Sequence, residues 1–231
     1  MTSEARRPSR RAAPAAALAL LLALTGCTGE GGGTADASAE PGREGTALEA
    51  VSSLTVKGRA PRTGYDRDDF GSAWIDTDDN GCGTRDDILR RDLTDVSLRS
   101  DGCEVLSGTL EEDPYTGRTV TFRRGSSRVD IDHVVALSDA WQKGAADWPE
   151  RRRVAFANDP LNLLAVSAAA NRGKGDGDAA TWLPADKSFR CPYVARQVAV
   201  KEKYGLWVTR AERAAMVRVL TTCPDEPLPV G

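Results

Sequence analysis

Hydrophobic and polar positions along the chain change their period several times, and these changes divide it into short elements. Alternation with period two, typical of half-buried strands, occurs at 119–124 and at 128–135. We expect these two segments to pair with each other. The segment 96–112 alternates on both sides of an Asp-Gly pair, which predicts a β-hairpin. An apolar run at 161–166 predicts a buried strand.

Helical periodicity alternates with these strand patterns. It occurs at 84–93, 136–146, 151–157, 192–204 and 209–222. Thr84 and Thr209 are placed to cap two of these helices, and Ser167 to cap another that begins at 168. The weak pattern at 48–60 is compatible with a short helix or strand. The chain is therefore predicted to be an α+β protein, with small antiparallel strands, flanking helices and a C-terminal helical hairpin.

The N-terminus has the pattern of an export signal. Four arginines precede the apolar segment 12–24, which is shorter than the about 20 residues that span a bilayer. The segment ends in LTGC, and this resembles a bacterial lipobox, which implies cleavage before Cys27 and acylation of its thiol. An ordinary secretory signal is the alternative. We expect a signal peptide at 1–26, a flexible Gly-, Ala- and Ser-rich tether at 27–47, and one domain at 48–231.

Net charge does not indicate a nucleic-acid partner. Removing four Arg and one Glu with the leader takes the 31 basic and 34 acidic residues to 27 and 33, a net charge of −6. Basic residues are concentrated locally, with four arginines in 118–128 and three consecutive ones at 151–153. The three arginines at 151–153 are equally compatible with the solvent-exposed face of a helix. Any nucleic-acid interface must therefore depend on local charge.

Four cysteines follow Cys27, and outside the cytoplasm an even number suggests disulfides. The helices at 192–204 and 209–222 are joined by a short connection, so they are expected to be antiparallel. This places Cys191 beside Cys223 and leaves Cys82 to pair with Cys103. A zinc site is less compatible, because no Cys-x-x-Cys pair exists and the single histidine lies elsewhere.

The turn 76–87 has some features of a calcium loop. Four residues fall at the first, third, fifth and sixth positions of an EF-hand loop, and one at its last: Asp76, Asp78, Asn80, Gly81 and Asp87. However, no helix enters the turn, and its last position is Asp rather than Glu. We favour an acidic turn fastened by a disulfide.

Three separate segments contain the residues best suited to catalysis. Asp132 and His133, the single histidine, lie where a strand is followed by a helix. Asn162 begins the strand at 161–166, and Asn171 opens the sequence NRGKGD. A neutral imidazole can accept a proton from water. Carboxylate and amide oxygens suit Mg²⁺ or Mn²⁺ rather than thiophilic metals.

This order of strand, excursion, strand and helix resembles the HNH nuclease motif in its ββα-metal form. The flanking sequences GCGTRDDILRRDL and DHVVALSDAWQKGA look like the secreted HNH lipoproteins common in actinomycetes. The resemblance covers roughly 60–225 and implies an HNH endonuclease with a ββα-metal core.

The resemblance also implies residue roles. His133 would be the general base, Asp132 and Asn171 the ligands of one Mg²⁺ or Mn²⁺ ion, and Asn162 would hold the loop before the histidine through backbone hydrogen bonds. The basic side chains expected to contact phosphate are Arg172, Lys174 and Arg124. A second imidazole is impossible in this chain, so a zinc site built on histidines is excluded.

We therefore expect a monomeric phosphodiester hydrolase outside the cytoplasm, held at the membrane only by its lipid, that acts on DNA in preference to RNA. The alternative from another class is a non-catalytic cell-envelope module that binds calcium at 76–87. The complete set Asp132, His133 and Asn171 favours the enzyme, because a degenerate module has no reason to keep all three.

Overall fold

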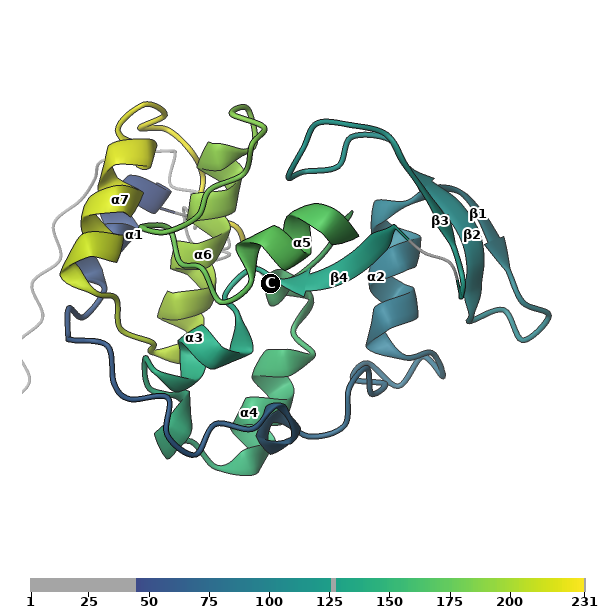
Figure 1. Ribbon diagram of the computed structural model, residues 1–231, viewed down its shortest axis with the longest axis horizontal. Coiled ribbons are helices and arrows are strands. Elements are labelled where there is room, and N and C mark those ends of the chain that lie inside the picture. The colour runs from purple at the N-terminus through teal and green to yellow at the C-terminus, as the bar shows by residue number, and fades with distance from the viewer. Residues whose placement is uncertain (1–44, 126–127, 231) are drawn as a thin grey trace, which may run out of the picture. The chain divides into compact units, whose positions relative to one another are not determined.

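Two small antiparallel sheets contain the strands of the described residues, which are 45–125 and 128–230 in this computed structural model (Figure 1). The first sheet has the order β1-β2-β3, and the second pairs β4 with β5. The bounds are β1 Thr94–Leu98, β2 Val105–Leu110, β3 Val120–Arg123, β4 Val129–His133 and β5 Leu163–Ser167. The hairpin predicted at 96–112 is confirmed as β1 and β2.

The predicted pairing of 119–124 with 128–135 is wrong. β3 pairs with β2, whereas β4 pairs with β5. The burial of the strands gives the reason. β3 buries only Phe122 and exposes its alternate residues, while β4 and β5 are buried on nearly every side chain. A strand buried on both faces is most stable beside another such strand.

Helices surround the second sheet. The α-helices are α1 Ala47–Ser53, α2 Thr84–Asp92, α3 Leu137–Trp141, α4 Glu150–Ala157, α5 Ala168–Lys174, α6 Arg190–Tyr204 and α7 Arg210–Leu220. Short 3₁₀ helices are η1 Arg67–Phe70, η2 Ala145–Asp147 and η3 Pro160–Asn162. The mixed α+β class is confirmed. No helix in the described part of the chain is long and apolar enough to cross a bilayer.

The C-terminal hairpin has the predicted form. Thr209 caps α7 and forms a capping box with Glu212. The disulfide between Cys191 and Cys223 joins the start of α6 to the end of α7. Helix α1 packs on both helices (Figure 1). Thr46 caps α1, and Ala47 is fully buried. The leader and Cys27 lie outside the described residues.

Helix α2 lies between the two sheets and contacts strands of both (Figure 1). Its N-terminal cap differs from the prediction. Gly83 is the N-cap, and the Thr84 hydroxyl instead donates to the carbonyl of Ile75. A Cβ on Gly83 would lie 2.6 Å from the carbonyl oxygen of Trp74, so this close approach requires glycine. Ser167 is likewise the N-cap of α5 without a side-chain hydrogen bond.

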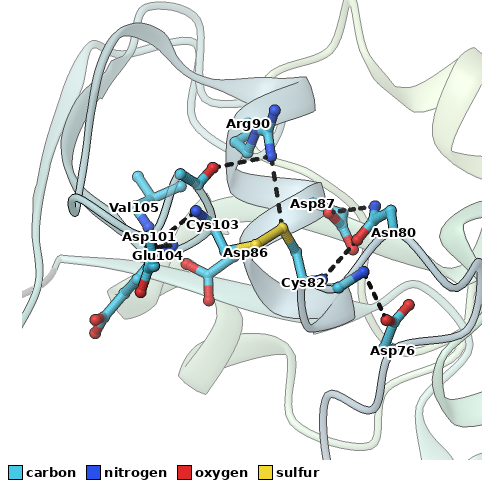
Figure 2. Close-up of a disulfide and its surroundings, with 12 residues drawn as sticks. Asp76, Asn80, Cys82, Asp86, Asp87, Arg90, Asp101, Cys103, Glu104 and Val105 are labelled. Atoms are coloured by element: carbon cyan, nitrogen blue, oxygen red, sulfur yellow. Dashed lines mark hydrogen bonds between the residues drawn. A yellow bond between two sulfur atoms is a disulfide. The ribbon is translucent and has the colours of Figure 1, made fainter.

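The second predicted disulfide, Cys82–Cys103, fastens the start of α2 to the β1–β2 hairpin (Figure 2). The Arg90 guanidinium lies 3.7 Å from the Cys82 sulfur and bonds the carbonyl of Gly102. The turn that precedes α2 is therefore attached both to the helix and to the first sheet.

Candidate functional site

A cavity of about 240 Å³ beside the end of β4 brings together the three residues predicted to perform the chemistry. Asp132 and His133 reach it from β4, and Asn171 reaches it from α5. Helix α5 packs against both β4 and β5 (Figure 1). The predicted order of strand, excursion, strand and helix is thus present as β4, the segment 134–162, β5 and α5.

The imidazole of His133 is buried, with only 6% of the residue exposed. Its Nε2 lies 2.8 Å from the carbonyl oxygen of Ala157 in α4. Because a carbonyl can only accept, Nε2 carries the proton and Nδ1 is the unprotonated nitrogen. Among the described residues, Nδ1 has no hydrogen-bond partner. The ring is thereby oriented with its basic nitrogen unoccupied.

Burial, with smaller contributions from the charges of Arg67 and Lys174, lowers the pKa of His133 from 6.5 to about 3, against the opposing effect of the hydrogen bond to Ala157. The imidazole is therefore neutral at pH 7, as a proton acceptor must be.

Asn162 connects this site to the strand pair. Its side chain is fully buried, and Oδ1 accepts from the backbone nitrogen of Val135 at 2.8 Å while Nδ2 donates to the Val135 carbonyl at 3.2 Å. The backbone nitrogen of Val134 also donates to the Asn162 carbonyl at 2.8 Å. Asn162 does hold a loop through backbone hydrogen bonds. The loop is the one after His133, however, not the one before it.

Asp132 is almost fully buried, and its carboxylate has two protein donors. The Tyr115 hydroxyl donates at 2.5 Å, and the Lys174 ammonium lies 3.0 and 3.1 Å from the two oxygens. Burial raises the pKa of Asp132, against the opposing charge of Lys174. Lys174 also donates to the carbonyl of His133 at 2.8 Å and is itself buried. The prediction that Lys174 contacts phosphate does not fit this arrangement, because its ammonium is committed to β4.

Asn171 has a partner that the sequence did not single out. Its Nδ2 donates to Asp130 at 3.3 Å, and Asp130 lies two residues before Asp132 on the same face of β4. With the amide nitrogen used in this way, Oδ1 has no partner among the described residues. A carboxylate that orients a ligand from behind is a common feature of metal sites.

The donors fit one hard divalent cation. Each oxygen of a carboxylate offers two lone pairs, and Asp132 Oδ1 accepts only from Lys174, so it keeps capacity for a ligand bond. Asn171 lines the same cavity and offers a neutral oxygen, Oδ1. Two protein oxygens suit Mg²⁺, which usually keeps several waters.

The two other predicted phosphate-binding residues differ in their surroundings. Arg124 is engaged: its guanidinium donates to the carbonyl of Val105 and pairs with Asp86 and Glu104. It holds β3 to β2 and α2, so it does not fit the predicted phosphate contact. Arg172 is exposed on α5, next to Asn171, and has no ion-pair partner among the described residues.

The turn at 76–87 satisfies its own polar groups. Asp76 accepts from the backbone nitrogen of Gly81, and the Asn80 amide donates to Asp87 (Figure 2). The Asn80 amide also donates to Asp78. In the part of the chain that the structure describes, three His, Cys or acidic ligand atoms gather only at Cys191, Cys223 and Glu226, where both sulfurs form the disulfide. The preference for an acidic turn fastened by a disulfide agrees with this geometry.

Two further residues near His133, Arg67 and Trp74, were not predicted from the sequence to belong to the site. Arg67, exposed in η1, lines the 240 Å³ cavity and also a second one of about 130 Å³ that His133 lines as well. The Trp74 ring stacks beside the His133 ring, with 6.0 Å between the ring centroids. The backbone φ of Trp74 is 62°, an uncommon value for a bulky residue. Both precede His133 by more than fifty residues in a loop without periodicity, so no local pattern indicates their position.

Comparison with known proteins identifies the class to which this fold and site belong. The chain belongs to the family described as GmrSD restriction endonucleases, C-terminal domain, which matches residues 83–219. This range contains both strands and the helix of the candidate site.

A relative from Arthroderma benhamiae (strain ATCC MYA-4681 / CBS 112371), named "Uncharacterized secreted protein", is 44% identical over 181 residues. The alignment covers 77% of this chain and 85% of the relative.

Proposed function

We propose that this protein is a metal-dependent endonuclease of the HNH type that hydrolyses phosphodiester bonds, with His133 as the general base. The observation that carries the proposal is the convergence of Asp132, His133 and Asn171 on one cavity, with the Nδ1 atom of His133 unoccupied. Membership of a restriction-endonuclease domain family supports nucleic acid as the substrate.

In this mechanism, Ala157 fixes the tautomer of His133, so that Nδ1 takes a proton from water as the water oxygen attacks phosphorus. The bond between phosphorus and the 3′-oxygen breaks, and the leaving oxygen takes a proton from solvent. A Mg²⁺ or Mn²⁺ ion held by Asp132 and Asn171 would offset the charge on the phosphate oxygens. Asp130 orients Asn171, and Lys174 holds Asp132 in place.

The proposed location is outside the cytoplasm, on the membrane through a lipid on Cys27. Two disulfides suit an oxidising compartment, and the relative named above is called secreted. We propose that the protein acts as a monomer on DNA in preference to RNA.

The test is cleavage of supercoiled plasmid and of an RNA of equal length by the purified protein, with Mg²⁺, with Mn²⁺ and with EDTA. Wild type should nick the plasmid only with metal. His133→Ala should lower the rate by roughly 10²- to 10⁴-fold, the usual contribution of a general base. Added imidazole should restore part of that loss. Wild-type activity in His133→Ala would refute the assignment.

Asn171→Ala should shift the Mg²⁺ concentration needed for half-maximal activity upward. Asn80→Ala, in the surface turn, is the matched control and should leave the titration unchanged. If both variants titrate like wild type, Asn171 is not a ligand.

A further inference from the structure

A groove at the other end of β4 lies outside the candidate site. It has a volume of about 520 Å³. Its walls come from the segment 116–121, from Arg128 just before β4, and from the first turns of α5.

The side chains of this groove have the chemistry of phosphate recognition. Three arginines line it, Arg118, Arg128 and Arg172, and all three are exposed. None pairs with an acidic side chain of the described residues, and no acidic residue is among those that line the groove. Thr121 and Ser167 add hydroxyl groups. Arginines and hydroxyl groups are the usual partners of phosphate oxygens in nucleic-acid complexes.

Hydrogen bonds hold the walls of the groove together. Asp113, fully buried, accepts from the backbone nitrogen of Ser167 at 2.9 Å and from the Thr116 hydroxyl. The backbone nitrogen of Ala168 donates to the carbonyl of Arg128 at 2.7 Å. The three guanidinium groups therefore extend from a backbone that is already fixed, which lowers the entropic cost of binding.

The groove and the candidate site are lined by neighbouring residues of α5. Asn171 lines the catalytic cavity and Arg172, the next residue of α5, lines the groove. Along β4, Arg128 and Asp132 are four residues apart, which corresponds to about 13 Å at about 3.3 Å per residue. That distance equals the rise of about four base pairs along the axis of a B-form duplex, at about 3.4 Å each.

We propose that this groove binds the phosphate backbone of nucleic acid on one side of the cleaved bond, through Arg118, Arg128 and Arg172. The inference rests on the proposed nuclease function and adds the direction in which the bound strand runs from the catalytic cavity. It also explains how a chain with a net charge of −3 can bind a polyanion.

The test measures binding without cleavage, by fluorescence anisotropy of a labelled duplex oligonucleotide in EDTA across a KCl titration. Arg118→Gln with Arg128→Gln is the test pair, since Arg172 adjoins Asn171. Loss of two phosphate contacts should reduce the slope of log K against log salt by about 1.8 for duplex DNA and weaken binding by between about 10- and 100-fold at low salt. The charge-preserving pair Arg118→Lys with Arg128→Lys should keep most of the slope.

The matched control is Arg210→Gln with Arg218→Gln, two exposed arginines of α7 that line neither cavity. If the test pair and the control pair bind equally while the wild type cleaves, the proposal for the groove is wrong and the nuclease proposal stands. A wild type that neither cleaves nor binds would overturn both. Thermal unfolding of each variant separates lost contacts from a lost fold.

Discussion

Replacement of Asn162 by alanine tests whether the loop after His133 depends on one buried amide. Asn162 and Val135 are both buried, with 0% and 1% exposed, and two hydrogen bonds join them. Truncation leaves the Val135 N–H and carbonyl without these partners in a dry environment. Each unsatisfied group costs about 1–3 kcal/mol, so the variant should lose about 4 kcal/mol of unfolding free energy.

Asn158→Ala is the matched control. Asn158 is equally buried, but its Nδ2 donates to a single carbonyl, that of Val154, and its Oδ1 has no hydrogen-bond partner within 45–125 and 128–230. The backbone nitrogen of Asn158 also donates to that carbonyl, so truncation leaves the carbonyl paired. We expect a loss of about 1 kcal/mol, the net value of one hydrogen bond.

The assay is urea unfolding followed by tryptophan fluorescence, with the disulfides intact. Nuclease activity should be measured well below the unfolding midpoint, where Asn162→Ala should also lower the rate because Val135 lies two residues after His133. If the two variants lose the same unfolding free energy to within about 1 kcal/mol, the reasoning is refuted. That interval is the net value of one ordinary hydrogen bond.

Three further predictions follow from other parts of the fold. Replacing Cys82 and Cys103 by alanine should lower the unfolding free energy by about 3 kcal/mol, from a sequence separation of 21 residues; an unchanged urea midpoint would contradict this. Replacing Lys143, which is fully buried between carboxylates, by methionine should lower the unfolding free energy by about 3–5 kcal/mol, measured by thermal unfolding. Arg67→Ala should lower kcat/KM on nucleic acid by about 10- to 150-fold, since a contact to a charged group is worth about 1.5–3 kcal/mol, with no change in the unfolding midpoint. Full activity in that variant would remove Arg67 from the site.

The local elements follow from local patterns. The hairpin of β1 and β2, the helices α4, α6 and α7, and the cap at Thr209 all lie where periodicity and capping residues indicate them. Each depends on hydrogen bonds between near neighbours, so a short window of sequence contains the necessary information.

Pairing over longer distances was less predictable. Both 119–124 and 128–135 alternate with period two, and alternation specifies a strand without specifying its partner. The choice depended on burial, which places β4 beside β5 and leaves β3 on the sheet with β2. Lys174 illustrates the same limit. Its position shortly after Asn171 predicted a contact to phosphate, whereas in the structure its ammonium lies between Asp132 and the His133 carbonyl.

The sequence by itself determined the chemistry available to this protein, because it contains one imidazole, in His133, beside a carboxylate in Asp132. It also determined the order of strands and helix around them. Only the tertiary structure decided which atoms of these side chains already have a protein partner. Ala157 occupies one nitrogen of His133, Asp130 occupies the amide nitrogen of Asn171, and Arg67 reaches the cavity from a distant loop. Such contacts join residues far apart in sequence, and their energy exists only once the chain has folded.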